Sequence, residues 1–213
     1  MVELKNFKIL KAWTEVSFSA IVQYVSDLKQ GEKMDYYRGF LSDGEISVPF
    51  ITFGRHLYSK MDRSVRFKKT RRFHLVKVRP DKYSGGELQF VINDGTQLED
   101  SDIDIPFLEP SEKITSIADI IEGKCSEGQL VSLPFTIKNW AGEREVECKD
   151  GKKKKLNEYL VEDKGKEILL TVWGRRKGQL VLEPEEQVFG RYVKVKNIAG
   201  EFSLETDAIS SVR

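Results

Sequence analysis

The sequence predicts a mainly β protein that contains two copies of one small barrel. The 213 residues, 39% of them hydrophobic and 32% charged, suit two small globular domains. Short apolar strands alternate with Gly-containing turns, as in small barrels. The same order of strands and turns also recurs in both halves of the chain, which indicates an internal duplication.

The internal repeat is clearest around two aromatic-Gly pairs. In the first half, an apolar strand, an acidic-Gly turn and an alternating strand lead to Phe53-Gly54. In the second half, the same order leads to Trp173-Gly174. After a short connection, expected to be helical, and a Val-rich strand, a third pair of segments matches. The matching segments are residues 36–44 with 156–165, 46–54 with 168–174, and 85–90 with 199–204.

Each copy also begins with an alternating strand, Phe18 to Val25 in the first and Val131 to Trp140 in the second. The count is therefore five strands per copy, with one non-strand connection between the third and fourth. Closing such strands into a barrel removes exposed strand edges. This arrangement matches the OB fold, whose second and third strands bind oligonucleotides. We expect two tandem five-stranded OB-fold barrels.

An acidic linker with a short helix is expected between the copies. Glu99 to Asp104 and Pro106 to Pro110 have linker composition, and Ser111 can cap a following helix. The apolar positions at helical spacing are Ile114, Ile117, Ala118 and Ile121, before Gly123. The expected domains are residues 10–98 for the first barrel, 99–123 for the linker and 124–213 for the second barrel.

The net charge of +1 conceals two blocks of opposite sign. Eleven Lys or Arg residues oppose two acids from Arg55 to Lys82, whereas ten acids oppose one base from Glu87 to Glu122. One region can therefore be strongly positive although the charges nearly cancel over the whole chain.

Residues 157–174 resemble the DNA-binding OB domains of the replication protein A large subunit, in which a strand, an acidic turn and a strand end near Leu-Trp-Gly. The resemblance implies that Trp173 stacks on a base and that Phe53 is its counterpart in the first copy. The family's second stacking position would hold Ile198 in copy two, while Tyr83 could stand in for it in copy one. The resemblance implies single-stranded nucleic acid as the partner, DNA favoured over RNA, and a nuclear role in DNA replication, repair or genome maintenance.

Cations flank the expected stacking positions and would contact phosphates. Those in the first copy are Arg55, His56, Lys68, Lys69, Arg71 and Arg72, and those in the second are Lys152, Lys153, Lys154, Lys155, Arg175, Arg176 and Lys177. The lysine run is expected in a long loop that begins near Ala141. It could equally be a solvated run that only aids solubility.

The basic segment Arg66 to His74 leaves three partners open: phosphates, a nuclear import receptor, or the acidic linker of the same chain. Strand alternation predicts Phe67, Phe73 and Leu75 inward, with Lys68, Arg72 and His74 outward.

Several functional classes lack their sequence signals. There is no Gly-rich phosphate loop, GxSxG or HExxH motif, so no catalytic residue is expected. The two cysteines, Cys125 and Cys148, form no CxxC motif, and the two histidines form no HxxxH motif. Neither a metal nor a cofactor is therefore expected. No apolar run approaches the ~20 residues of a membrane span.

Two rival functions stay open. An OB barrel can serve as a protein-interaction module, in which case Phe53 and Trp173 would be buried, and the acidic linker could bind protein partners. Binding of a duplex through its backbone would use the cations but not the aromatic residues.

Overall fold

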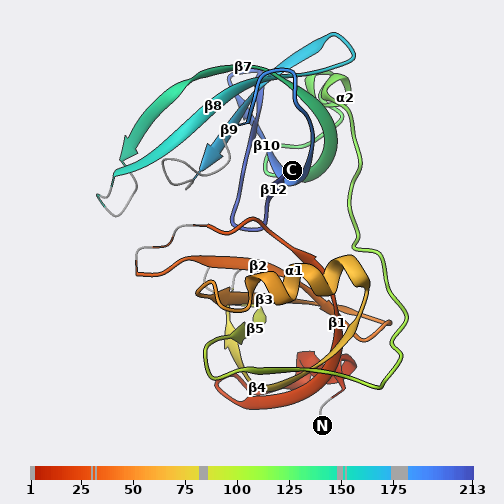
Figure 1. The fold of residues 1–213 in the computed structure, drawn as a ribbon. Coiled ribbons are helices and arrows are strands. Elements are labelled where there is room, and N and C mark those ends of the chain that lie inside the picture. Colours follow the sequence, from red (N-terminus) through yellow and green to blue (C-terminus); the bar gives the residue numbers. More distant parts are fainter. Residues whose placement is uncertain are drawn as a thin grey trace. The chain divides into compact units, whose positions relative to one another are not determined.

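The computed structural model describes residues 3–29, 31, 33–81, 86–147, 151, 153–173 and 182–213. The chain divides into two compact units, residues 1–110 and 111–213. The mainly β class is confirmed, because strands form both units (Figure 1). Among the described residues, no helix is long and apolar enough to cross a membrane.

In unit 1, five strands pair into a closed ring. β1 pairs with β2, β2 with β3, β3 with β5, β5 with β4, and β4 with β1. Only the β3 and β5 pair is parallel. A further strand, β6, extends the free edge of β4. The elements are η1 (Leu4–Ile9), β1 (Glu15–Val25), β2 (Tyr36–Ser42), β3 (Ser47–Phe53), α1 (Tyr58–Phe67), β4 (Thr70–Pro80), β5 (Leu88–Ile92) and β6 (Gln97–Asp100).

Unit 2 repeats this order of pairing. β7 pairs with β8, β8 with β9, β9 with β11, β11 with β10, and β10 with β7, and the β9 and β11 pair is again the parallel one. The short strand β12 lies beside β10, as β6 lies beside β4. The elements are α2 (Ile117–Ile121), β7 (Leu130–Glu147), β8 (Lys153–Asp163), β9 (Lys166–Trp173), β10 (Gln187–Ile198), β11 (Glu201–Glu205) and β12 (Ser211–Val212).

The two units also share their irregularities. The register of the first strand shifts between Val22 and Tyr24 in unit 1 and between Ile137 and Asn139 in unit 2. The fourth strand carries an extra residue opposite the first strand in both units, a β-bulge. Matching bulges in matching strands strengthen the case for a duplicated fold.

The bulge in β4 overturns one alternation prediction. Leu75 has a positive φ of 58° and is 47% exposed, whereas Val76 is fully buried opposite Val16. In β10, Tyr192 has a φ of 52° and Val193 is buried opposite Val131. The extra residue reverses the facing of the strand, so the prediction that Leu75 points inward was wrong.

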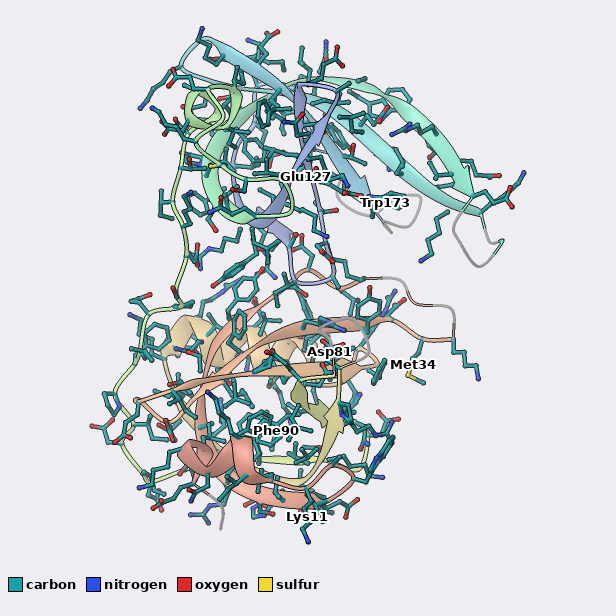
Figure 2. The ribbon with its side chains drawn as sticks, turned by 180° about the vertical axis from the view of Figure 1, so that it is seen from behind. Lys11, Met34, Asp81, Phe90, Glu127 and Trp173 are labelled. Carbon is teal, nitrogen blue, oxygen red and sulfur yellow. The ribbon has the colours of Figure 1, made fainter. Side chains whose placement is uncertain are left out.

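The cores fill the same positions with different side chains. In unit 1, Phe18 stacks on Phe73 and Phe90, with ring centroids 5.3 and 4.5 Å apart, and Figure 2 shows Phe90 among the strands of the unit. The position of Phe73 is taken in unit 2 by Gly190, where an added Cβ would lie 2.8 Å from the Phe135 ring. The space that Phe73 of the fourth strand fills in unit 1 is therefore filled in unit 2 by Phe135 of the first strand.

The short helix predicted between the copies belongs to unit 2 and begins later than predicted. Ser116 caps α2, accepting a hydrogen bond from the Asp119 amide at 3.1 Å and donating to the Asp119 carboxylate at 2.7 Å. The bond from the Asp119 amide is the hydrogen bond typical of a serine N-cap. Ile114 instead forms a β-bridge with Ser132, so it and Ser111 lie outside the helix.

Candidate nucleic-acid interface

Phe53 lies on the outer face of the first unit. Along β3, Val48, Phe50 and Thr52 point inward, so Ile51 and Phe53 point outward. Phe53 is partly exposed and does not belong to the hydrophobic core, and its cross-strand neighbour is Tyr36 of β2. Two aromatic side chains therefore lie side by side at this end of the face.

The residues after Phe53 hold a cation beside it. Gly54 has a φ of 87°, and its amide donates to the Asp35 carbonyl at 2.7 Å. The Asp35 carboxylate is buried and accepts a hydrogen bond from Arg55 Nε at 2.5 Å, while 55% of the Arg55 side chain stays exposed. His56 Nδ1 lies 3.0 Å from Asp94. Arg55 is thus fixed through Nε while more than half of its side chain stays exposed.

The hairpin between β4 and β5 is anchored to the same face. Arg38, two residues from Tyr36 on β2, donates two hydrogen bonds to Asp81 at 2.8 and 3.3 Å. Both side chains are largely buried. Tyr83, the predicted second platform, lies outside the described residues, but Asp81 places the start of its hairpin at the face.

Trp173 occupies the position of Phe53 in the second unit. It ends β9 opposite Leu156 of β8, on the face away from the buried Leu170 and Val172. Its indole N–H donates to the Glu205 carboxylate, and its amide donates to Thr206 Oγ1 at 2.9 Å. Trp173 is partly exposed and lies at the end of its strand (Figure 2). Neither predicted platform belongs to a core cluster.

Ile198, the residue at the family's second stacking position, is 69% exposed at the end of β10. Arg175, Arg176 and Lys177 lie outside the described residues.

The predicted long loop after Ala141 is instead a two-stranded ribbon. β7 continues to Glu147 and pairs with β8 as far as Lys153. The expectation of a loop was therefore wrong: residues 143–147 pair with β8, and their acidic residues recur at every second position, as on one face of a strand.

One face of the ribbon carries two ion pairs between lysines of β8 and glutamates of β7. Lys153 contacts Glu145 at 3.2 Å, and Lys155 donates to Glu143 at 2.7 Å. The hydrogen bond to Glu143 raises the pKa of the Lys155 ammonium. Two lysines of the predicted phosphate-binding run are thus already paired with carboxylates, and Lys152 lies outside the described residues.

The other face of the ribbon continues the face of Trp173. Lys154 is the cross-strand neighbour of Val146, and Arg144 is that of Leu156, which in turn lies opposite Trp173. Directly opposed residues share a face of a sheet. Arg144 Nε contacts Glu158 at 3.0 Å, whereas Lys154 makes no ion pair within the described part of the chain. Arg144 was missed from the sequence, because its place on this face depends on the register of β7 against β8.

The basic strand β4 meets the acidic segment of its own unit. β6 places Asp100 against Arg71 and Glu99 against His74, the latter at 3.6 Å. Of the three partners left open for this segment, the structure shows the acidic segment of the same chain.

The acidic segment also reaches the turn before β4. Lys68 Nζ lies 3.3 Å from Glu109 and 4.3 Å from the centroid of the Phe107 ring. Arg72 is partly buried opposite Glu99, and Lys69 is exposed without an ion pair among the described residues.

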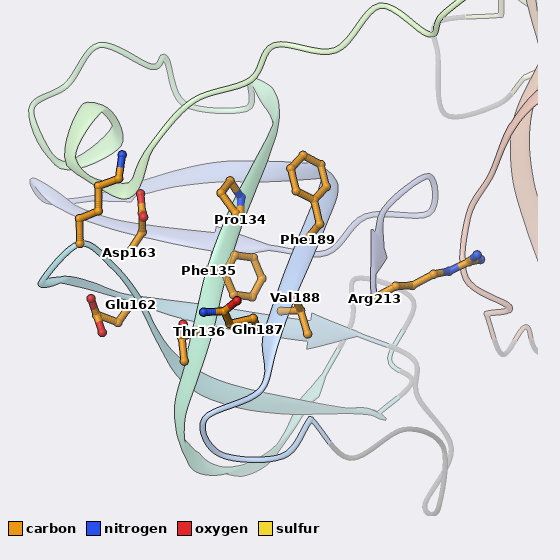
Figure 3. A pocket seen from close by; sticks show the side chains of 10 residues that line it. Pro134, Phe135, Thr136, Glu162, Asp163, Gln187, Val188, Phe189 and Arg213 are labelled. Atoms are coloured by element: carbon orange, nitrogen blue, oxygen red, sulfur yellow. The ribbon is translucent and has the colours of Figure 1, made fainter.

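A pocket of about 470 Å³ lies elsewhere on unit 2, beside the start of β10 and the turn between β8 and β9 (Figure 3). Its lining includes Phe135, Glu162, Asp163, Val188 and Arg213, and none of the predicted binding residues. The described residues contain no group of three His, Cys, Asp or Glu side chains that could hold a metal.

The chain matches no protein-family model and no curated protein sequence. Its fold is similar to that of several solved structures. A chain of a replication protein A heterotrimer bound to ssDNA gives a TM-score of 0.64 at 17% identity, covering 93% of this chain and 48% of that one. The HINa domain of Ifi202 in complex with a 20-base-pair dsDNA gives 0.54 at 12%, covering 95% and 97%. A HIN1 domain in complex with a 12-mer dsDNA gives 0.55 at 13%, covering 98% of each chain. At these identities the likeness is one of fold.

Proposed function

We propose that the chain binds single-stranded nucleic acid, DNA in preference to RNA, without catalysing a reaction. The binding would use two OB-fold barrels, residues 10–98 and 124–213, joined by the acidic segment 99–123. The observation that carries the proposal is the recurrence of a partly exposed aromatic residue, Phe53 and Trp173, at one outer-face position of both units. A nuclear role in DNA replication or repair follows from the resemblance and is proposed with it.

The residues around each aromatic suit an unpaired strand. Base stacking on an aromatic ring is worth about 1–3 kcal/mol per base and tolerates any base. Arg55 adds a cation beside Phe53 in unit 1, and Arg144 and Lys154 add cations on the face of Trp173 in unit 2. A strand would therefore place bases on the rings and phosphates beside the cations.

Duplex DNA is the second candidate ligand. Two of the structures with a similar fold are HIN domains in complex with dsDNA, and each is covered over almost its whole length. A duplex keeps its bases stacked on one another. Its phosphates would therefore contact the cations, and its bases would not stack on the aromatic residues.

A fluorescence-anisotropy titration separates these ligands. Labelled oligo-dT, its RNA analogue and a duplex would be titrated at two salt concentrations with wild type, Phe53→Ala and Trp173→Ala. We expect oligo-dT to bind best and each substitution to cost about 1–3 kcal/mol of binding free energy. Trp140→Ala is the matched control, because Trp140 is 57% exposed in the same unit but lies opposite the inward-facing Tyr159.

Two results would overturn the proposal. The first is an absence of oligonucleotide binding at low salt. The second is equal binding of duplex and single strand with no effect of either substitution, which would favour duplex binding through the backbone.

A further inference from the structure

The helix α1 presents an aromatic residue to solvent among cations. Phe67 was predicted to point inward, but it is 64% exposed. α1 buries Met61 and Ser64 against the barrel, and Lys60, Arg63 and Phe67, at spacings of three and four residues, share an exposed side next to the buried one. All three of these side chains are exposed.

The end of α1 adds a further cation. Lys68 adopts a left-handed conformation with a φ of 48°, which ends the helix and turns the chain towards β4. Lys69 follows directly and is exposed. We call Lys60, Arg63, Phe67 and Lys69 the α1 surface.

The acidic segment of unit 1 leaves the α1 surface uncompensated. Its carboxylates pair with Arg71, His74 and Lys68. Within the part of the chain that the structure describes, none of the three cations of the α1 surface makes an ion pair. Part of the positive charge of the basic block therefore remains without an ion pair at the helix, among the described residues.

We propose that the α1 surface is a second nucleic-acid-binding surface of unit 1, on which Lys60, Arg63 and Lys69 contact phosphates and Phe67 stacks on a base. This inference rests on the proposed function. Exposed aromatics among flexible cations are what an unpaired strand requires. α1 begins five residues after Phe53 and, with ten residues, is about 15 Å long. A strand that leaves the Phe53 face near Arg55 could therefore continue along α1.

The test compares two triple variants with equal changes of charge. Lys60→Gln/Arg63→Gln/Lys69→Gln removes the cations of the α1 surface. Lys8→Gln/Lys11→Gln/Lys164→Gln removes three other exposed cations that make no ion pair among the described residues. The affinity for a long oligo-dT would be measured over a range of salt concentrations, with circular dichroism to verify folding.

We expect the α1 triple variant to reduce the slope of log affinity against log salt by about 2, since each single-strand phosphate contact contributes about 0.7. The control triple variant should leave the slope near that of wild type. Phe67→Ala should weaken binding about tenfold, within the range for loss of one stacked base. Crosslinking of a bromodeoxyuridine-substituted oligonucleotide should label Phe67.

The inference can fail while the proposed function stands. If wild type binds oligo-dT and Phe53→Ala weakens it, but the two triple variants behave alike and Phe67 is not labelled, the α1 surface does not bind the strand. Absence of any binding by wild type would instead remove the proposed function and the inference together.

Discussion

At the scale of single residues, one inserted position in β4 decides which side chains form the core. Leu75 takes the bulge with a positive φ, and Val76 takes the buried place opposite Val16. Plain alternation from Phe73 would bury Leu75 and expose Val76. A bulge is set by pairing with a distant strand, and no local sequence signal marked it here.

A pair of alanine substitutions tests this placement. Val76→Ala should destabilise the protein by about 2 kcal/mol, because it removes buried methyl groups and leaves a cavity. Leu75→Ala should change stability by less than about 0.5 kcal/mol, as expected of an exposed site. Urea denaturation measures both, and a larger loss for Leu75→Ala would contradict the bulge.

The lysine run provides a second test at this scale. Lys154 lies on the face of Trp173 without an ion pair among the described residues, whereas its neighbour Lys155 is hydrogen-bonded to Glu143 on the opposite face. Lys154→Gln should therefore lower the salt slope of oligo-dT binding by about 0.7, the value for one phosphate contact. Lys155→Gln is the control and should leave the slope nearly unchanged. Equal effects of both substitutions would mean that the run acts only as diffuse charge.

The candidate site was predictable in part. The aromatic-Gly repeat located Phe53 and Trp173, since alternation within each strand is a local property. The two faces of the lysine run were not resolved, because they depend on the register of β7 against β8. Arg144 became recognisable only when that register placed it opposite Leu156.

At the scale of elements, β6 and the segment after it neutralise part of the basic block from Arg55 to Lys82. Asp100 pairs with Arg71, and Glu109 pairs with Lys68. The segment is also fastened by uncharged contacts: the Leu108 carbonyl accepts from Gln23 at 2.5 Å, and the Ile105 amide donates to Thr70 at 3.4 Å. Removing its charges should therefore leave the segment in place while freeing the cations beneath it.

Neutralising the paired acids should strengthen binding. Asp100→Asn/Glu109→Gln would release Arg71 and Lys68, so oligo-dT should bind more tightly at low salt and the slope should steepen by up to about 1.4 for two new phosphate contacts. Asp102→Asn/Asp104→Asn is the matched control, because these exposed acids belong to the same segment and make no ion pair among the described residues. Similar gains from both variants would indicate a general effect of charge and not a release of these two cations.

At the scale of the whole molecule, the duplicated order of strands could be predicted, and the differences in charge between the two copies could not. The fold depends on strand order and turns, which recur along the sequence. The faces depend on single positions: Arg38 on the outer face of unit 1 corresponds to Glu158 in unit 2, since each lies two residues after the neighbour of the aromatic platform. One unit therefore places a cation where the other places a carboxylate.

Two units that both bind should make affinity depend on strand length. One OB module covers roughly 4–16 nucleotides, so a short oligonucleotide engages one unit while a longer one can engage both. Once one unit is bound, the tether makes the second event intramolecular and raises the affinity through effective concentration. We therefore expect affinity to rise steeply along a ladder of oligo-dT lengths once both units can be reached. Phe53→Ala or Trp173→Ala should each flatten that rise while sparing short-strand binding by the intact unit. A wild-type affinity that stays equal at every length would mean that a single unit carries all of the binding.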